Sequence, residues 1–166
     1  MAKKLLLLSI LLGFAFALTI PAAPATAASA VKTPYTGVEL GVVCADPYWS
    51  SYCQPGELTV LPNGKAIMRN VGLVIAFDTS DPRFTGMAVV SFDFQPGSAQ
   101  VTPINGRITF YPTGIDGYWE GTVSITITPD GWHSQYEAKG YGALDGMIIY
   151  GVNRSGSISG VIIEKP

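Results

Sequence analysis

Three aromatic side chains lie between the chain's only two cysteines. Tyr48, Trp49 and Tyr52 fall within the segment bounded by Cys44 and Cys53. Aromatic faces stack on sugar rings and pack against apolar ligands, and a closed segment would order them at a smaller entropy loss on binding. Two interpretations stay open. The segment is either a lid that plugs one end of the fold or a ligand-binding surface, and the second makes Tyr48, Trp49 and Tyr52 candidate ligand-binding residues.

The two cysteines predict a structural disulfide. Two cysteines allow a single intramolecular pairing, and a Cys44–Cys53 bridge would persist in an oxidising compartment. Eight residues separate them, unlike the C-x-x-C spacing of redox pairs, and no strongly positive neighbour is present to lower a thiol pKa.

Two arginines stand out among the charges. Arg69 shares an otherwise apolar strand face, so it needs a carboxylate partner or an anion, because an unpaired buried charge is destabilising. This makes Arg69 a fourth candidate ligand-binding residue. Asp81-Pro82-Arg83 predicts a turn with an aspartate-to-backbone hydrogen bond, in which Arg83 latches the loop.

Catalytic groups are scarce. His133 is the only histidine, no G-x-S-x-G motif is present, and one histidine without clustered carboxylates does not suit a catalytic metal. A carboxylate pair for glycoside cleavage could come from Asp93, Glu120 and Glu137. Alternation puts Asp93 and Glu120 opposite the apolar face; that polar face is either wet or, in a barrel, turned inward. We therefore name no catalytic residue, metal or cofactor. The sequence favours a protein without enzymatic activity, and an enzyme remains the alternative.

The first residues have the pattern of a secretory signal. Lys3 and Lys4 precede an apolar run that is too short to span a bilayer, followed by a small-residue region with two alternative cleavage triplets, 25–27 and 28–30. We expect a signal peptide over 1–30, a single domain over 31–166, and a soluble secreted or extracytoplasmic protein without a membrane span. Removal of the signal peptide would change the net charge from −2 to −4. A negative net charge does not suit nucleic-acid binding.

Short alternating segments predict an all-β domain. The clearest is Trp119 to Thr128, apolar on one face and polar on the other. It is one of about nine expected strands: 37–43, 57–61, 65–77, 85–94, 107–111, 119–128, 132–139, 144–150 and 157–164. Sequential strands joined by tight turns favour a small antiparallel barrel of eight or nine strands, with a β-sandwich as the alternative.

Several glycines recur two or three residues into these segments, as expected where a barrel bends. Residues 81–86, 119–122 and 139–146 resemble a pattern in small exported prokaryotic β-proteins of unknown function. The last block, Gly-x-Gly-x-Leu-x-Gly, is also similar to a segment of allene oxide cyclase-like and dirigent-like barrels. The resemblance covers residues 81–160 at most, implies an eight-stranded barrel with an interior pocket, and matches no catalytic residue.

Three functions follow as hypotheses. The first is an exported β-barrel that binds a small apolar or carbohydrate-like ligand. The second is a structural or protein-interaction module, and the third is a cyclase- or isomerase-like pocket enzyme. A charged, wet cavity would favour the enzyme, whereas a filled interior would favour the structural module. The oligomeric state is left open.

Overall fold

The computed structural model describes residues 29–96 and 104–166. Within this part of the chain no helix is long and apolar enough to cross a membrane. The signal expected over 1–30 falls almost entirely outside the described residues.

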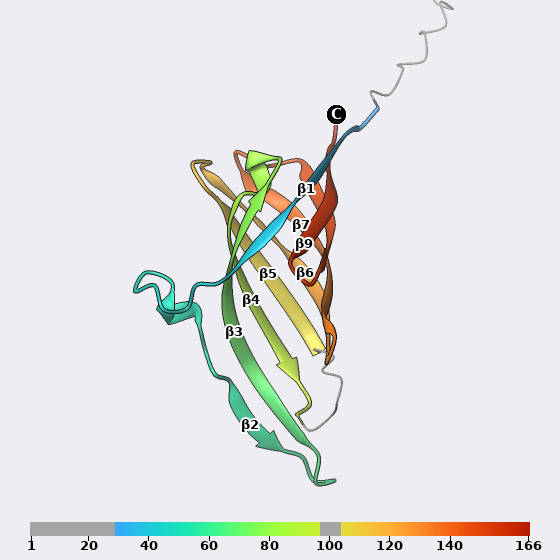
Figure 1. Ribbon diagram of the computed structural model, residues 1–166. Helices are drawn as coiled ribbons and strands as arrows, with labels where there is room; N and C mark the ends of the chain where they lie inside the picture. Colours follow the sequence, from blue (N-terminus) through green and yellow to red (C-terminus); the bar gives the residue numbers. More distant parts are fainter. Residues whose placement is uncertain (1–28, 97–103) are drawn as a thin grey trace, which may run out of the picture.

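The described residues form one antiparallel sheet of nine strands (Figure 1). Two short 3₁₀ helices, η1 and η2, interrupt the chain. In order, the elements are β1 (Val31–Val42), η1 (Ser50–Tyr52), β2 (Glu57–Val60), β3 (Ala66–Thr79), η2 (Pro82–Phe84), β4 (Gly86–Phe94), β5 (Ile104–Pro112), β6 (Gly117–Thr128), β7 (Gly131–Gly142), β8 (Met147–Arg154) and β9 (Ser157–Glu164).

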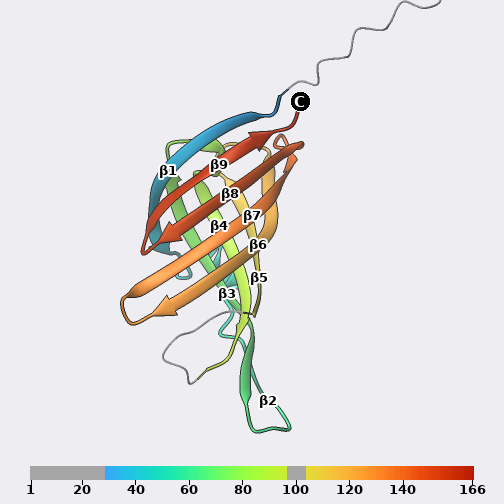
Figure 2. The same ribbon diagram turned by 90° about the vertical axis from the view of Figure 1, so that its right-hand side faces the viewer.

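The sheet closes on itself into a ring of eight strands. Its order is β1-β9-β8-β7-β6-β5-β4-β3, and β1 also pairs with β3, while β2 extends from β3 outside the ring. Figure 2 shows β1, β9, β8 and β7 side by side. The all-β antiparallel prediction is confirmed, and the closure is barrel-like rather than sandwich-like.

Closure depends on a close approach between β1 and β3. Gly37 lies opposite Thr79, and a Cβ on Gly37 would fall 2.3 Å from the Asp78 carbonyl oxygen. Hydrogen would therefore be the only side chain that fits there without backbone movement. A register shift follows between Glu39 and Gly41, so that Val42 again shares a face with Ile75 on β3.

Apolar side chains line the inside of the ring. On β6 and β7 the buried residues alternate with exposed polar ones, as the period-2 pattern predicts. Trp119 and Ile149 are fully buried, and Phe84 is 1% exposed. The face that carries Glu120 and Glu137 is therefore the outer one.

Candidate ligand-binding site

An apolar cavity of about 280 Å³ lies inside the ring, toward the end away from η2. We call it the cup. Inward-facing side chains from β1 and β3 to β8 line it, including Leu73, Ile75, Val90, Ile108 and Ile125. At its rim Val42, Ile127 and Trp132 are 54%, 41% and 39% exposed. The cup therefore has apolar walls and an apolar, solvent-facing mouth.

The other half of the ring is filled by aromatic rings. Phe84, from η2, stacks on Phe110 with ring centroids 4.2 Å apart and on Tyr136 at 5.2 Å. Phe77 packs 5.8 Å from Phe84 and also lines the cup. These rings form the floor of the cup and close the ring at the η2 end.

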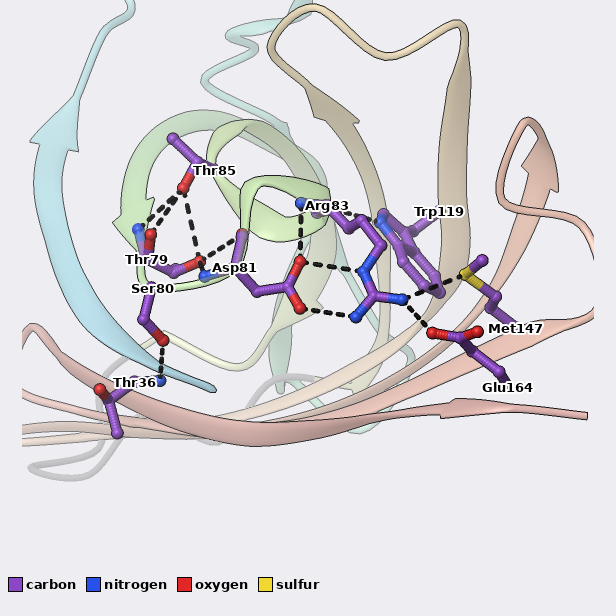
Figure 3. Close-up of polar contacts among 9 residues, drawn as sticks. All are labelled: Thr36, Thr79, Ser80, Asp81, Arg83, Thr85, Trp119, Met147 and Glu164. Carbon is purple, nitrogen blue, oxygen red and sulfur yellow. Dashed lines mark hydrogen bonds and ion pairs between the residues drawn. The ribbon is translucent and has the colours of Figure 1, made fainter. Parts of the chain in front are cut away.

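An arginine clamps this closed end (Figure 3). Asp81 accepts the Arg83 backbone N–H at 3.0 Å and two guanidinium bonds at 2.9 and 2.7 Å. The guanidinium also pairs with Glu164 of β9, and the Arg83 carbonyl accepts the Trp119 indole N–H at 2.7 Å. Hydrogen bonds from Arg83 hold the pKa of Asp81 below its usual range, and those to Asp81 raise the pKa of Arg83. The predicted latch is present, and it joins η2 to β6 and β9.

Two tyrosine hydroxyls meet beneath the cup. The Tyr35 and Tyr136 hydroxyls are 2.8 Å apart, and Tyr35 donates to the Tyr150 carbonyl at 3.3 Å. Tyr136 is then the donor to Tyr35. A Cβ on Gly160 would fall 2.3 Å from the Tyr35 hydroxyl, so this glycine leaves room for the pair. Burial raises the pKa of both tyrosines, and both stay neutral hydrogen-bonding groups.

Polar atoms reach the cup at few points. The Asn153 amide donates to Glu39 at 2.5 Å and its oxygen accepts the Gly156 backbone N–H at 2.9 Å. Glu39 is half-buried, Asn153 is 3% exposed, and both line the cup with Ser134. The Glu39 carboxylate is thus the one charged group among the residues described as lining this cavity.

The disulfide loop does not plug either end of the ring. Cys44 and Cys53 are bonded, with Cα atoms 5.7 Å apart. Gln54 exchanges two backbone hydrogen bonds with Gly72 of β3, at 3.1 and 2.9 Å, and Trp49 lies 6.0 Å from the ring of Tyr111 on β5. The loop therefore docks on the outer wall (Figure 1), and the lid interpretation is wrong.

The structure separates the predicted ligand-binding residues. Tyr48, Trp49 and Tyr52 cluster on the outer wall, with Trp49 4.8 Å from Tyr48 and 5.8 Å from Tyr52. Arg69 lies elsewhere on β3, opposite Glu57 and 3.7 Å from the Asp93 carboxylate. It thus has the carboxylate partner considered from the sequence. None of the four is among the cup residues.

The other candidate chemistry is dispersed. Glu120, Glu137 and His133 lie on the outer face of β6 and β7, and Asp93 accepts the Asn70 backbone N–H at 2.9 Å. In residues 29–96 and 104–166 no three or more His, Cys, Asp or Glu side chains gather as a metal site.

Sequence reasoning missed the cup's polar contacts. Glu39 and Asn153 belong to strands far apart in the chain, and they meet because β1 and β8 pair with opposite edges of β9. Strand alternation alone could have placed Glu39 inward, since it shares a face with Tyr35. No protein-family model, curated protein or solved structure compared with the chain matches it.

Proposed function

We propose that the protein binds a small, mainly apolar molecule in the cup. The observation that carries the proposal is a cavity of about 280 Å³ with apolar walls, open at an exposed apolar rim. Ligand pockets commonly begin near roughly 300 Å³, so the ligand is small. Covering apolar wall that faces water supplies binding free energy of about 25 cal/mol per Å².

Glu39 limits which polar groups a ligand of the cup could carry. Its carboxylate only accepts hydrogen bonds when ionised, and Asn153 supplies one donor. A ligand hydroxyl or ammonium group at the rim would supply another. A ligand carboxylate would be repelled by Glu39 as a like charge. We therefore expect an apolar body with a neutral or cationic polar end.

The cup's composition favours binding over the other two hypotheses. A wet, charged interior was the expectation for a pocket enzyme, and a filled interior was the expectation for a structural module. The cup is apolar with Glu39 in its lining, and Phe84 and Phe110 fill only the other half of the ring.

We place this binding outside the cytoplasm. The Cys44–Cys53 disulfide suits an oxidising compartment, and this agrees with the signal expected over residues 1–30.

Displacement of a fluorescent probe tests the proposal. We expect N-phenyl-1-naphthylamine to bind the protein, and octylamine to displace it at least tenfold better than octanoate at neutral pH. Ile125→Trp, which adds bulk to the cup wall, should abolish probe binding. The matched control is Leu40→Trp, because Leu40 is 66% exposed on β1 and is not a cup residue.

Native mass spectrometry of the protein from its own host gives a second readout. A bound small molecule that Ile125→Trp excludes and Leu40→Trp retains supports the proposal. Probe binding that both variants preserve, or that both lose while remaining folded, places the ligand elsewhere and overturns it.

A further inference from the structure

A continuous row of aromatic rings crosses the outer wall of the ring. In the disulfide loop, Trp49 lies 6.0 Å from Tyr111 of β5. Tyr111 lies 6.2 Å from Tyr118 of β6, which in turn stacks at 5.0 Å on Tyr141 of β7. We call these residues, together with Tyr48 and Tyr52, the aromatic strip. It runs from the disulfide loop across β5, β6 and β7, away from the cup.

The strip is exposed rather than part of the core. Tyr111, Tyr118 and Tyr141 are 37%, 37% and 38% exposed, and Tyr48 is 75% exposed. Their neighbours Phe110 and Trp119 point inward and are buried, so alternation fixes the tyrosines on the outer face. Rings left exposed in contiguous order mark an interaction surface.

A hollow lies at one end of the strip. It has a volume of about 380 Å³ and is lined by Tyr48, Trp49, Tyr52, Tyr111 and the neighbouring Met87, Pro112 and Thr113. Burial, followed by the nearby Tyr52 and Tyr118, raises the pKa of Tyr111. Its phenol therefore remains a neutral donor and acceptor at the edge of the hollow.

A polar row runs beside the strip. Along β5, β6 and β7 the next outward-facing residues are Thr109, Glu120 and Lys139, and the register sets Thr109 opposite Glu120 and Glu120 opposite Lys139. Glu120 and Lys139 are exposed and their charges balance. The surface thus offers ring faces along one line and hydrogen-bonding groups along the next, and the two charges of the polar row offset each other.

We propose that the aromatic strip binds a neutral polysaccharide chain. A sugar ring presents C–H groups on its faces and hydroxyls at its edges, which fits ring faces beside a polar row. Five of the six aromatic residues carry hydroxyls, unlike a surface meant for an aliphatic partner. The disulfide and the ring-to-ring contacts hold the rings in place before binding, which lowers the ordering entropy.

Affinity electrophoresis in gels that contain polysaccharide tests this site. The neutral probes are laminarin, xyloglucan and galactomannan, with polygalacturonate and alginate as anionic comparators. We expect retardation by at least one neutral chain and weaker retardation by the anionic ones. Tyr118→Ala should weaken the affinity for the retarding neutral polysaccharide at least tenfold, and Trp49→Ala should do the same.

Tyr150→Ala is the matched control. Tyr150 is 38% exposed on the outer wall, on β8, and bonds Glu137 rather than another aromatic ring. Its removal should change affinity by less than twofold. All variants should keep N-phenyl-1-naphthylamine binding in the cup, which separates loss of this site from loss of the fold.

Three outcomes overturn the proposal. The first is retardation by none of the neutral chains. The second is equal loss of binding in Tyr118→Ala and Tyr150→Ala. The third is concentration-dependent self-association, or binding to phosphatidylcholine vesicles, that Tyr118→Ala abolishes while polysaccharide binding is absent; this would assign the strip to a second copy or to a membrane.

Discussion

At the closed end of the ring, a single residue joins η2 to two distant strands. The Arg83 guanidinium bonds Asp81, the residue before η2, and pairs with Glu164 at the end of β9, and the Arg83 backbone carbonyl accepts the Trp119 indole N–H from β6. The Asp81 side chain is 9% exposed and that of Arg83 is 21% exposed. Removal of the Asp81 charge would leave the partly buried Arg83 with one carboxylate partner, Glu164, in place of two, and removing one partner of a buried pair is strongly destabilising.

Asp81→Asn should destabilise the protein by about 3 kcal/mol at pH 7. Arg83 lowers the folded-state pKa of Asp81, so this stabilisation is present above the unfolded pKa of about 3.9. It is lost as the pH falls through the folded-state pKa. Urea unfolding at pH 7, 4 and 2.5 should show the difference between wild type and Asp81→Asn shrinking toward the acid end.

Asp130→Asn provides the control for this experiment. Asp130 lies exposed in the turn between β6 and β7, and Asn suits a turn equally well. Its free energy of unfolding should follow wild type at every pH. A gap between wild type and Asp81→Asn that stays constant down to pH 2.5 would contradict the assigned role of the carboxylate.

The contacts of Arg83 and Arg69 could be predicted from the sequence only in part. Asp81-Pro82-Arg83 is a local pattern, and its turn and latch could be predicted from neighbouring residues. The partners Glu164 and Trp119 could not, because they reach Arg83 through the fold. For Arg69, the register shift between Met68 and Val71 breaks the alternation on which the expected face rested.

At the scale of elements, the disulfide loop acts as an attachment to the outer wall. Gln54, just outside the closed loop, exchanges two backbone hydrogen bonds with Gly72, and we expect these bonds to hold that end of the loop on β3 when the disulfide is absent. The loop carries half of the aromatic strip and none of the cup residues.

A Cys44→Ser/Cys53→Ser variant should lose up to about 2.7 kcal/mol of stability, from the closure entropy of a loop of roughly ten residues. Probe binding in the cup should be unchanged, while polysaccharide binding should weaken because three rings lose their fixed positions. Urea unfolding and the two binding assays measure these effects. Wild-type protein reduced with dithiothreitol should match the variant, and a weaker cup in either sample would refute the separation of the two sites.

Strand positions were the most predictable feature. The last strand coincides with its expected range, 157–164, because alternation and the preceding turn are both clear. β8 runs over Met147–Arg154 rather than 144–150, since residues 143–146 form the turn after β7. β1 starts at Val31 rather than at Gly37, because Val31 to Val38 pair with β9, a partner that local sequence does not reveal.

At the scale of the whole molecule, closure of the ring around the cup depends on the pairing of β1 with β3. Alternation shows which face of each strand is apolar, but it is the same in a ring and in a sandwich. The closing contact is set by residues such as Gly37 that let the two backbones approach. For this reason alternation favoured a barrel but located no cavity, and an interior pocket was expected only from the family resemblance.

Gly37→Val should therefore lower the free energy of unfolding by about 3 kcal/mol or more, as expected for overpacking against backbone. A Cβ there would meet the Asp78 carbonyl oxygen and the Thr79 Cα at 2.3 and 2.7 Å. Urea unfolding measures the loss, and probe binding in the cup should fall with it. The control is Val38→Ala, at a neighbouring position that is 50% exposed. It should change the free energy of unfolding by well under 1 kcal/mol. Equal stability of Gly37→Val and wild type would contradict the prediction, because it would show that the ring tolerates a wider gap between β1 and β3.

The pairing of β1 with β9 also sets an order of events. These strands come from opposite ends of the described chain, and Val31 lies opposite Glu164. A growing chain is made from its N-terminus, so β1 must wait for its second neighbour until β9 has been synthesised. Folding dominated by such distant contacts is slow, on the order of milliseconds to seconds. During that interval β1 and β8 have unpaired edges, and a chain that ended before Ser157 would have neither a closed ring nor a complete cup.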